Sequence, residues 1–283
     1  MKFKDFIFSF YLIFYNFFFI KKKCLKAFKK LVNFPYRCLQ YYLKKKFSSK
    51  SLNLDKMNIK KKDFHYLFNK FGSDKAKKFM WGNKIVDGHD YSPFYEKYLK
   101  KYKKKQNINI LEIGSLYGSS AAAFFFYFLK PKIVCADVSP FFIRSFSENI
   151  RPIYIDTQSE KVIKKTSKYL DLKFDIIIDD GSHNIKDQLI CLKCLFPSLN
   201  KGGMYIIEDL TQFKSVPALN PDNEKNTTID LLKSIKFKKK CFSSYFNKKE
   251  IIYLNKNVKG INFEKGNYKE KNINISDIAF IQK

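Results

Sequence analysis

Two short apolar runs that end in acidic residues constrain this chain more than any other feature. Residues 174–183 read FDIIIDDGSH, and residues 204–210 read MYIIEDL. Runs of this length, rich in isoleucine and closed abruptly by polar residues, are typical of buried parallel strands. Because parallel strands end at one rim of an open α/β sheet, where ligands bind, the pattern predicts an enzyme site at that rim. The polar residues expected there are Asp179, Asp180, His183, Glu208 and Asp209.

A third strand-like run, upstream of these two, leads into a turn that contains two glycines. Residues 108–113 read INILEI, and Gly114 and Gly118 follow before a run of small and aromatic residues of helical length. Glycine lets the backbone turn sharply and approach a ligand, and the amides at the start of a helix favour polar or anionic groups. The spacing differs from the G-x-G-x-x-G of dinucleotide sites, so the turn alone is a weak signal. Residues 132–137 form the next predicted strand, and its final acid, Asp137, suits a ribose diol.

The net charge of +29 comes almost entirely from lysine, since only three of the 55 basic residues are arginine. Surfaces that read phosphates or bases favour arginine, because its planar guanidinium can bond to two atoms at once. The composition therefore argues against nucleic acid as a partner and indicates a weak attraction to acidic surfaces.

The six cysteines show no disulfide framework for a chain of 283 residues, which fits a reducing cytosol. Cys191 and Cys194 form a CxxC pair within residues 188–195, which we predict to be helical. A zinc site would need a second pair or a nearby histidine, and the sequence has neither. We therefore interpret the pair as two thiols on one helix face.

The first 50 residues have the composition of a membrane-associated segment. Residues 6–20 are almost all apolar, and three lysines follow at 21–23. As a helix, this run covers about 22 Å, less than the roughly 30 Å hydrocarbon core, so we expect it to dip into the membrane or to span it as a short anchor. Lysines alternating with aromatic residues up to position 50 favour an anionic membrane surface. Because a positively charged flank stays on the cytoplasmic side, we expect the catalytic domain to lie at the cytoplasmic face of a membrane. The alternative is a phenylalanine-rich helix that packs on the domain.

The chain is long enough for one full α/β domain with an N-terminal appendage. We divide it into a membrane-associated anchor at 1–50, a linker and cap region at 51–105, and the α/β domain at 106–283. The serine-rich residues 47–53 are the predicted linker. Further strands are predicted at residues 152–156, 251–255 and 277–281, the last two as an antiparallel hairpin at the edge of the sheet.

The order of these motifs resembles that of class I S-adenosylmethionine-dependent methyltransferases. LEIGSLYGSS, FDIIIDDGSH and GGMYIIEDL follow one another as in the magnesium-dependent sugar O-methyltransferases of the mycinamicin and tetracenomycin-rhamnose type. Two earlier segments, GSDK at 72–75 and HDYSPFYEKYL at 89–99, are also similar. The resemblance covers residues 71–210. It implies a Rossmann-like, seven-stranded α/β sheet, mostly parallel with an antiparallel last strand, beside an N-terminal helical, membrane-associated extension.

The resemblance also implies a metal and a general base. It assigns Mg²⁺, or another hard divalent cation, to Asp180, Glu208 and Asp209, and carboxylate oxygens suit such a cation better than they suit zinc. It makes His183 the base that takes the proton from an acceptor hydroxyl, while the bound cation would stabilise the developing alkoxide. Judged by residue type alone, a strand-end network of hydrogen bonds without metal and a structural histidine remain alternatives.

The resemblance implies S-adenosylmethionine as the methyl donor. It carries over the cofactor-binding residues Glu112, Gly114, Gly118, Ser120 and Asp137.

Two further positions, Asp156 and Gln158, fall where this fold holds adenine, although this chain has Asp-Thr-Gln at 156–158 where the family more often has Gly-Asp-Gln. Asp179 is expected near the sulfonium end of the cofactor, in a binding or a structural role. Three more residues either cover the cofactor or acceptor or serve in aromatic packing: His89, Tyr91 and Tyr95.

The expected function is therefore that of a membrane-associated, metal-assisted O-methyltransferase that acts on a saccharide hydroxyl, such as that of a lipid-linked glycan. One alternative is another hydroxyl acceptor, either a lipid or a small phenol. A second is an RNA methyltransferase, which would bind RNA in a strongly salt-dependent manner. A third is a non-catalytic binding module that keeps the fold.

Overall fold

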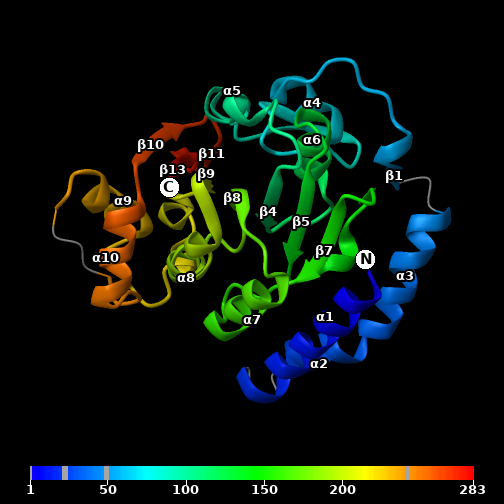
Figure 1. Cartoon of the computed structure of the whole chain (residues 1–283), viewed down its shortest axis with the longest axis horizontal. Helices are drawn as coiled ribbons and strands as arrows, with labels where there is room; N and C mark the ends of the chain where they lie inside the picture. The colour runs from blue at the N-terminus through cyan, green and yellow to red at the C-terminus, as the bar shows by residue number, and fades with distance from the viewer. Residues whose placement is uncertain (1, 21–24, 48–50, 240–242) are drawn as a thin grey trace.

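The computed structural model describes residues 2–20, 25–47, 51–239 and 243–283 (Figure 1). Its helices are α1 (Phe3–Tyr15), α2 (Leu25–Val32), α3 (Phe34–Phe47), α4 (Phe64–Phe71), α5 (Ser92–Leu99), α6 (Ser119–Tyr127), α7 (Glu160–Leu170), α8 (Ile185–Leu195), α9 (Thr228–Lys236) and α10 (Lys248–Asn257), and a π-helical turn, η1 (Asn16–Ile20), continues α1. Its strands are β1 (Leu52–Asn53), β2 (Lys78–Trp81), β3 (Lys84–Asp87), β4 (Asn109–Ile113), β5 (Lys132–Asp137), β6 (Ser145–Phe146), β7 (Ile150–Tyr154), β8 (Phe174–Asp179), β9 (Leu199–Ile207), β10 (Gly260–Lys265), β11 (Lys269–Glu270), β12 (Ile273–Asn274) and β13 (Asp277–Gln282).

Within the described residues, the main sheet contains seven strands in the order β10-β13-β9-β8-β4-β5-β7. The five strands from β9 to β7 are parallel, and β13 is antiparallel to both of its neighbours. The chain runs from β4 to β5 on one side and later returns to β8 on the other, so the order reverses at the carboxyl end of β4. In an open α/β sheet, such a reversal opens a crevice for ligands.

The strands read as continuous apolar runs because both faces of the sheet are buried. Side chains alternate between the two faces along each strand. Ile176 and Ile178 of β8 belong to the core beneath α4, α5 and α6, whereas Ile177 belongs to the core beneath α7 and α8. Figure 1 shows these two groups of helices on opposite sides of the sheet. The α/β architecture predicted from the sequence is therefore present.

The strand predicted at residues 251–255 is wrong, because this segment lies within α10. The Asn247 side chain accepts a hydrogen bond from the Glu250 amide (3.0 Å), and the Glu250 carboxylate accepts one from the Asn247 amide (2.8 Å). This capping box starts a helix, and Leu254 supplies its buried contact. The edge hairpin pairs β10 with β13, which contains the predicted strand 277–281.

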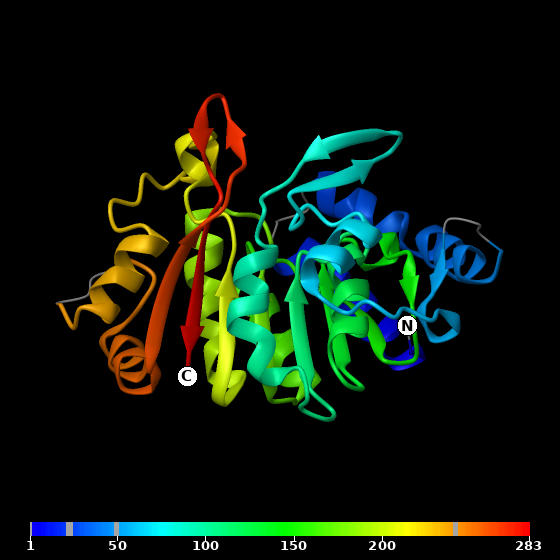
Figure 2. The same ribbon diagram turned by 90° about the horizontal axis from the view of Figure 1, so that it is seen from above.

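The cap region contributes α4, the hairpin β2–β3 and α5, and Figure 2 shows the hairpin projecting from the body of the molecule. Asp63 caps α4 by accepting a hydrogen bond from the Tyr66 amide (2.9 Å), and Gly72 ends the helix with a φ of 66°. In the predicted linker, β1 pairs with β6 in a short parallel ladder, and residues 48–50 lie outside the described part of the chain.

Helix α1 packs along the edge strand β7 through polar side chains. Asp5 is fully buried and accepts hydrogen bonds from Arg151 Nε (2.9 Å) and from Tyr169 Oη (2.9 Å). Ser9 Oγ accepts a bond from the Tyr154 amide (3.2 Å). The helix is therefore docked on the domain, as in the alternative considered for residues 6–20.

The segment Phe3–Ile20 is long and apolar enough to cross a membrane, with one third of it buried in the structure. A core helix of a soluble protein or a signal sequence can have the same composition. The predicted lysine cluster at 21–23 lies outside the described residues.

Both cysteines of the CxxC pair lie on α8 as free thiols, with Cys191 buried and Cys194 half-buried.

Candidate active site

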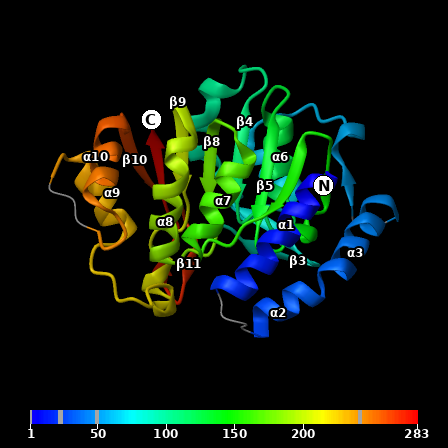
Figure 3. The ribbon, with the colours of Figure 1, turned by 60° about the horizontal axis from the view of Figure 1, so that its bottom comes forward.

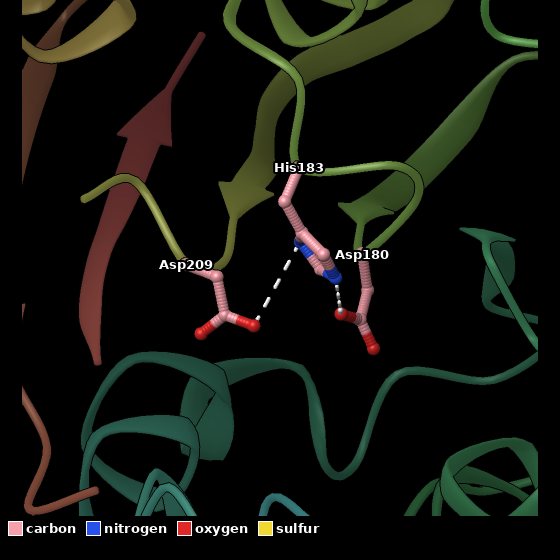
Figure 4. Close-up of side chains that lie close together, drawn as sticks. All are labelled: Asp180, His183 and Asp209. Carbon is pink, nitrogen blue, oxygen red and sulfur yellow. Dashed lines mark ion pairs between the residues drawn. The ribbon is translucent and has the colours of Figure 1, made fainter. Parts of the chain in front are cut away.

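The two acidic strand ends meet at one rim, as the sequence predicts. β8 and β9 are parallel neighbours, and their pairing sets Asp179 beside Ile207. Residues 180–183 and 208–209 therefore leave the sheet side by side. Figure 4 shows Asp180, His183 and Asp209 facing one another.

A buried lysine from the cap region joins this acidic group. Lys75 is 1% exposed, and its Nζ lies 2.5 Å from Asp180 Oδ2 and 2.9 Å from Glu208 Oε2. Burial alone would lower the pKa of Lys75, but Asp180 and Glu208 outweigh this effect and hold the pKa well above its usual value. Lys75 is therefore charged and neutralises part of the cluster.

The aromatic residues of the 89–99 segment bind the acids of β9. Tyr95 Oη donates a hydrogen bond to Glu208 Oε1, and Tyr91 Oη donates one to Asp209 Oδ1 (2.6 Å). His89 Nδ1 lies 3.0 Å from the same Asp209 oxygen. The structure thus gives these three residues a definite role in positioning the carboxylates.

Burial and neighbouring charges shift the pKa values of the acids and the histidine at the site. Burial alone would raise the pKa of Asp209, but the neighbouring His89 holds it far below its usual value. For His89 the signs are reversed: burial alone would lower its pKa, but Asp209 raises it to about 9. Glu208 shows the opposite behaviour, since burial and the charge of Asp180 raise its pKa well above the usual value. Of the two acids that follow β9, Asp209 is therefore the one that remains ionised more readily.

One group of side chains could hold a metal ion. Asp180, His183 and Asp209 each offer a ligand atom, and these atoms lie within 4.8 Å of one another. His183 Nε2 is 3.9 Å from Asp180 Oδ1, and Nδ1 is 3.7 Å from Asp209 Oδ2. Of the three predicted ligands, Glu208 is also at the site, but its two carboxylate oxygens bond to Lys75 and Tyr95.

The backbone at two of these positions is strained. His183 has a φ of 56° and Asp209 a φ of 53°, in the left-handed region that non-glycine residues seldom occupy. Such conformations cost free energy and persist where the surrounding structure fixes them, often at functional sites.

Close contacts surround both glycines of the turn after β4. Gly114 has a φ of 84°, and a Cβ atom there would lie 1.8 Å from the carbonyl oxygen of Asp180. Gly118 has a φ of 76°, and a Cβ there would lie 2.7 Å from Ile143 Cγ1. Both positions therefore require glycine.

Glu112, just before this turn, is fully buried and accepts a hydrogen bond from Ser120 Oγ. Burial raises the pKa of Glu112 to about 7.

Two pockets meet at the carboxyl end of the sheet. The first, of about 350 Å³, contains Asp156 and Gln158, and the second, of about 440 Å³, contains Ser120 and His183. Both are lined by Gly114, Asp137, Val138 and Gly181. The two pockets therefore form one extended binding region across the switch point of the sheet.

The predicted cofactor acids occupy different parts of this region. Asp137 Oδ2 accepts a hydrogen bond from the Leu116 amide (2.9 Å), which ties the acid to the glycine turn. Asp156 Oδ1 accepts one from the Gln158 amide (3.1 Å).

Asp179 is 3% exposed and does not line either pocket. Burial raises its pKa to about 8, and Tyr205 Oη bonds to it (3.4 Å).

No protein-family model matches the chain. It is 27% identical over 173 residues to 8-demethyl-8-alpha-L-rhamnosyl tetracenomycin-C 2'-O-methyltransferase from Streptomyces olivaceus, covering 58% of this chain and 42% of that protein. It is 28% identical over 131 residues to mycinamicin VI 2''-O-methyltransferase from Micromonospora griseorubida, covering 43% and 32%. Among solved structures, it matches the methyltransferase MycE in complex with Mg, S-adenosylhomocysteine and mycinamycin VI, with a TM-score of 0.57 and 24% identity over 79% of this chain and 54% of that one.

The chain is similar in sequence to sugar O-methyltransferases and has the class I methyltransferase fold. The resemblance inferred from the sequence is thereby confirmed. The chain spans less than half the length of these two curated relatives and about half of the MycE chain.

Within this methyltransferase fold, sequence reasoning missed two site residues. Lys75 lies in the GSDK segment, whose sequence supports the resemblance but gives the lysine no role. A buried lysine is rare, and where one occurs it is paired with acids. Asn16 lines the first pocket from a helix that the sequence analysis assigned to a membrane anchor. The only signal for Asn16 is its polarity within the apolar run 6–20.

Proposed function

We propose that this protein is an S-adenosylmethionine-dependent O-methyltransferase that methylates a saccharide hydroxyl with the help of Mg²⁺ or another hard divalent cation. The observation that carries the proposal is the junction of the two pockets beside His183 and the carboxylates of Asp180 and Asp209. A methyl donor lying across both pockets would bring its sulfonium end to this group. The similarity to sugar O-methyltransferases supports the choice of reaction.

The cofactor would lie with its nucleoside in the first pocket and its amino acid portion along the glycine turn. Asp137 lies where the two pockets meet, so its carboxylate can accept hydrogen bonds from the ribose hydroxyls. Gly114 lets the backbone lie against the methionine portion. Asp179 does not line either pocket, so it would affect the cofactor only indirectly, through the backbone that leads to Asp180.

The donor atoms at the site fit a hard cation. Asp180 and Asp209 supply carboxylate oxygens, and the strongly lowered pKa of Asp209 keeps this acid ionised. When bound, such a cation offsets the charge of the acids and stabilises the negative charge that develops on an acceptor oxygen. Both carboxylate oxygens of Glu208 bond to Lys75 or Tyr95, whereas Lys75 bonds to Oδ2 of Asp180 and leaves Oδ1 facing His183. We therefore propose Asp180 and Asp209 as the primary ligands.

His183 would serve as the general base. Its ring is 21% exposed and lines the second pocket, where an acceptor hydroxyl can reach a ring nitrogen. As the hydroxyl oxygen forms a bond to the methyl carbon, the carbon–sulfur bond breaks and His183 takes the hydroxyl proton. The products are a methyl ether and S-adenosylhomocysteine.

The second pocket also has a surface suited to a sugar ring. The aromatic side chains of Phe79, Trp81 and Tyr117 line it together with His183, and the rings of Trp81 and Tyr117 lie 6.3 Å apart. Flat aromatic faces can cover the apolar face of a sugar while polar groups fix its orientation. The relatives named above act on glycosides, which favours the same acceptor class for this chain.

We also propose that the N-terminal helices hold the protein on the anionic, cytoplasmic face of a membrane. Apolar side chains cover the outer face of α1, η1 and α2, and they include Phe3, Ile7, Phe10, Phe14, Phe18, Phe19, Leu25, Phe28 and Val32. Figure 3 shows α1, α2 and α3 together at one end of the molecule. Because Asp5 and Ser9 bond to the domain, α1 would lie on the surface rather than cross the bilayer. A lipid-linked glycan would then be the natural acceptor.

The test is methyl transfer from labelled S-adenosylmethionine to rhamnosides and other glycosides, with Mg²⁺ and with EDTA. The expected result is a methyl ether that requires Mg²⁺ and disappears in the Asp209→Asn variant. Asp87→Asn, which alters an acid with a 73% exposed side chain, should keep full activity. Equal transfer in EDTA and in Mg²⁺ would overturn the metal assignment. Transfer to phenols or lipids alone would overturn the choice of acceptor.

A further inference from the structure

The first pocket has one wall from outside the region that resembles the methyltransferases. Ile13, Asn16 and Lys30 line it from the N-terminal helices, together with Asp156 and Gln158. The wall includes Asn16, where α1 passes into the π-helical turn η1. Such turns interrupt the regular helical ladder and occur frequently at functional sites.

The Asn16 side chain bonds directly to the acid of the pocket. Its Nδ2 donates to Asp156 Oδ2 (2.7 Å) and to Tyr154 Oη (3.0 Å). The side chain is 3% exposed, and among the described residues its Oδ1 has no hydrogen-bond partner. The other oxygen of Asp156, Oδ1, accepts a hydrogen bond from the Gln158 amide. Each carboxylate oxygen of Asp156 therefore has a donor that fixes its orientation.

The position of Asn16 is set by the docking of α1. Asp5, Ser9 and Asn16 are the buried polar residues of the described helix α1–η1, and their spacing places them on one helical face against β7. Asp5 and Ser9 fix the helix to Arg151 and to the Tyr154 amide. The polar stripe on this apolar segment therefore ends at the cofactor pocket.

We infer that α1 is a wall of the nucleoside pocket and that Asn16 is a positioning residue for the cofactor. Asn16 orients the Asp156 carboxylate so that it can accept a hydrogen bond from the exocyclic amine of adenine. The inference rests on the proposed function, because it concerns the methyl donor. It gives the N-terminal segment a role in cofactor selection that a membrane anchor alone would not have.

The experiment compares the binding of S-adenosylhomocysteine and S-inosylhomocysteine, in which an oxo group replaces the amine, by calorimetry without lipid. The wild-type chain should prefer the adenine ligand at least about tenfold, because its amine donates to a charged acceptor. Asn16→Ala should weaken binding of S-adenosylhomocysteine about three- to tenfold and move the ratio of the two affinities towards one. Phe14→Ser, on the exposed face of the same helix, should leave both affinities unchanged.

A second variant keeps the inference testable if Asn16→Ala does not fold. Asn16→Leu, which keeps the approximate size of the side chain but removes the donor to Asp156, should also move the ratio of the two affinities towards one. Asp156→Asn should remove the preference for adenine. If Asn16→Ala lowers both affinities equally, or leaves the ratio at its wild-type value, the positioning role is overturned. A preference retained in Asp156→Asn also overturns it. If the wild-type chain binds neither ligand, the proposed function itself fails.

Discussion

The Nζ atom of Lys75 lies 2.9 Å from Oε2 of Glu208, and both side chains are almost completely buried. Lys75 is also the close partner of Asp180. A buried carboxylate without a positive partner is strongly unfavourable. The charge of Lys75 therefore stabilises the ionised forms of two acids of the candidate site.

Replacing this lysine should destabilise the fold. Lys75→Met leaves the buried Glu208 and the half-buried Asp180 without their cation, and breaking a buried pair in this way costs about 3–5 kcal/mol of the free energy of unfolding. Urea denaturation in EDTA measures the loss. Lys78→Met is the matched control, because Lys78 is 63% exposed and 3.9 Å from its partner Asp87. Equal stability of the two variants would contradict the assigned role of Lys75.

The base assignment predicts a defect in chemistry without a defect in cofactor binding. His183→Gln should lower kcat by about 10²–10⁴-fold, the range for loss of a general base. The affinity for S-adenosylhomocysteine should remain within about threefold of wild type, since His183 belongs to the acceptor side of the pocket in our proposal. Steady-state kinetics and calorimetry separate the two quantities. His65→Gln, an exposed histidine on α4, should change neither.

Glu112 should make the fold less stable as pH rises. Burial raises its pKa from 4.5 to about 7. Between these two values the folded protein holds a proton that the unfolded chain releases, so the free energy of unfolding falls as pH increases from about 4.5 to about 7. This contribution is on the order of 3 kcal/mol. Removing the titration with Glu112→Gln should flatten the dependence, as followed by urea denaturation across this range.

The control for this pH dependence is Glu148→Gln, which alters an exposed acid and should keep the wild-type slope. A slope unchanged in Glu112→Gln would mean that Glu112 is ionised in the folded protein throughout the range.

The exposed aromatic face of α1 and η1 should bind anionic vesicles. Phe14 and Phe18 are both 41% exposed, and their ring centroids lie 4.4 Å apart. Replacing both with serine removes partial burial of two large apolar groups, so vesicle affinity should fall about tenfold or more. Sedimentation with phosphatidylserine vesicles measures the effect. Ile252→Ser, an exposed apolar residue on α10, should bind as wild type does. A wild-type chain that stays in the supernatant would refute the membrane proposal.

Several parts of the fold could be predicted because local and global signals agree. Residues 132–137 and 174–179 were predicted as strands with the bounds that the structure gives, since burial on both faces leaves an uninterrupted apolar run. The segment 251–255 was mistaken for a strand because its apolar residues form a short run. The segment forms a helix because the capping box of Asn247 and Glu250, just upstream, starts α10.

The sequence by itself determined which acids and which histidine stand at the rim, because parallel strands place their carboxyl ends at one edge. It also determined the glycine turn, since Gly114 and Gly118 have positive φ angles and no room for a Cβ atom. Only the tertiary structure decided that Lys75 and Tyr95 bond to Glu208 and that Asn16 reaches Asp156. These contacts join residues more than 100 positions apart, so no local pattern encodes them. They form because buried polar groups need partners, and the docking of the cap and of α1 determines which partners are in reach.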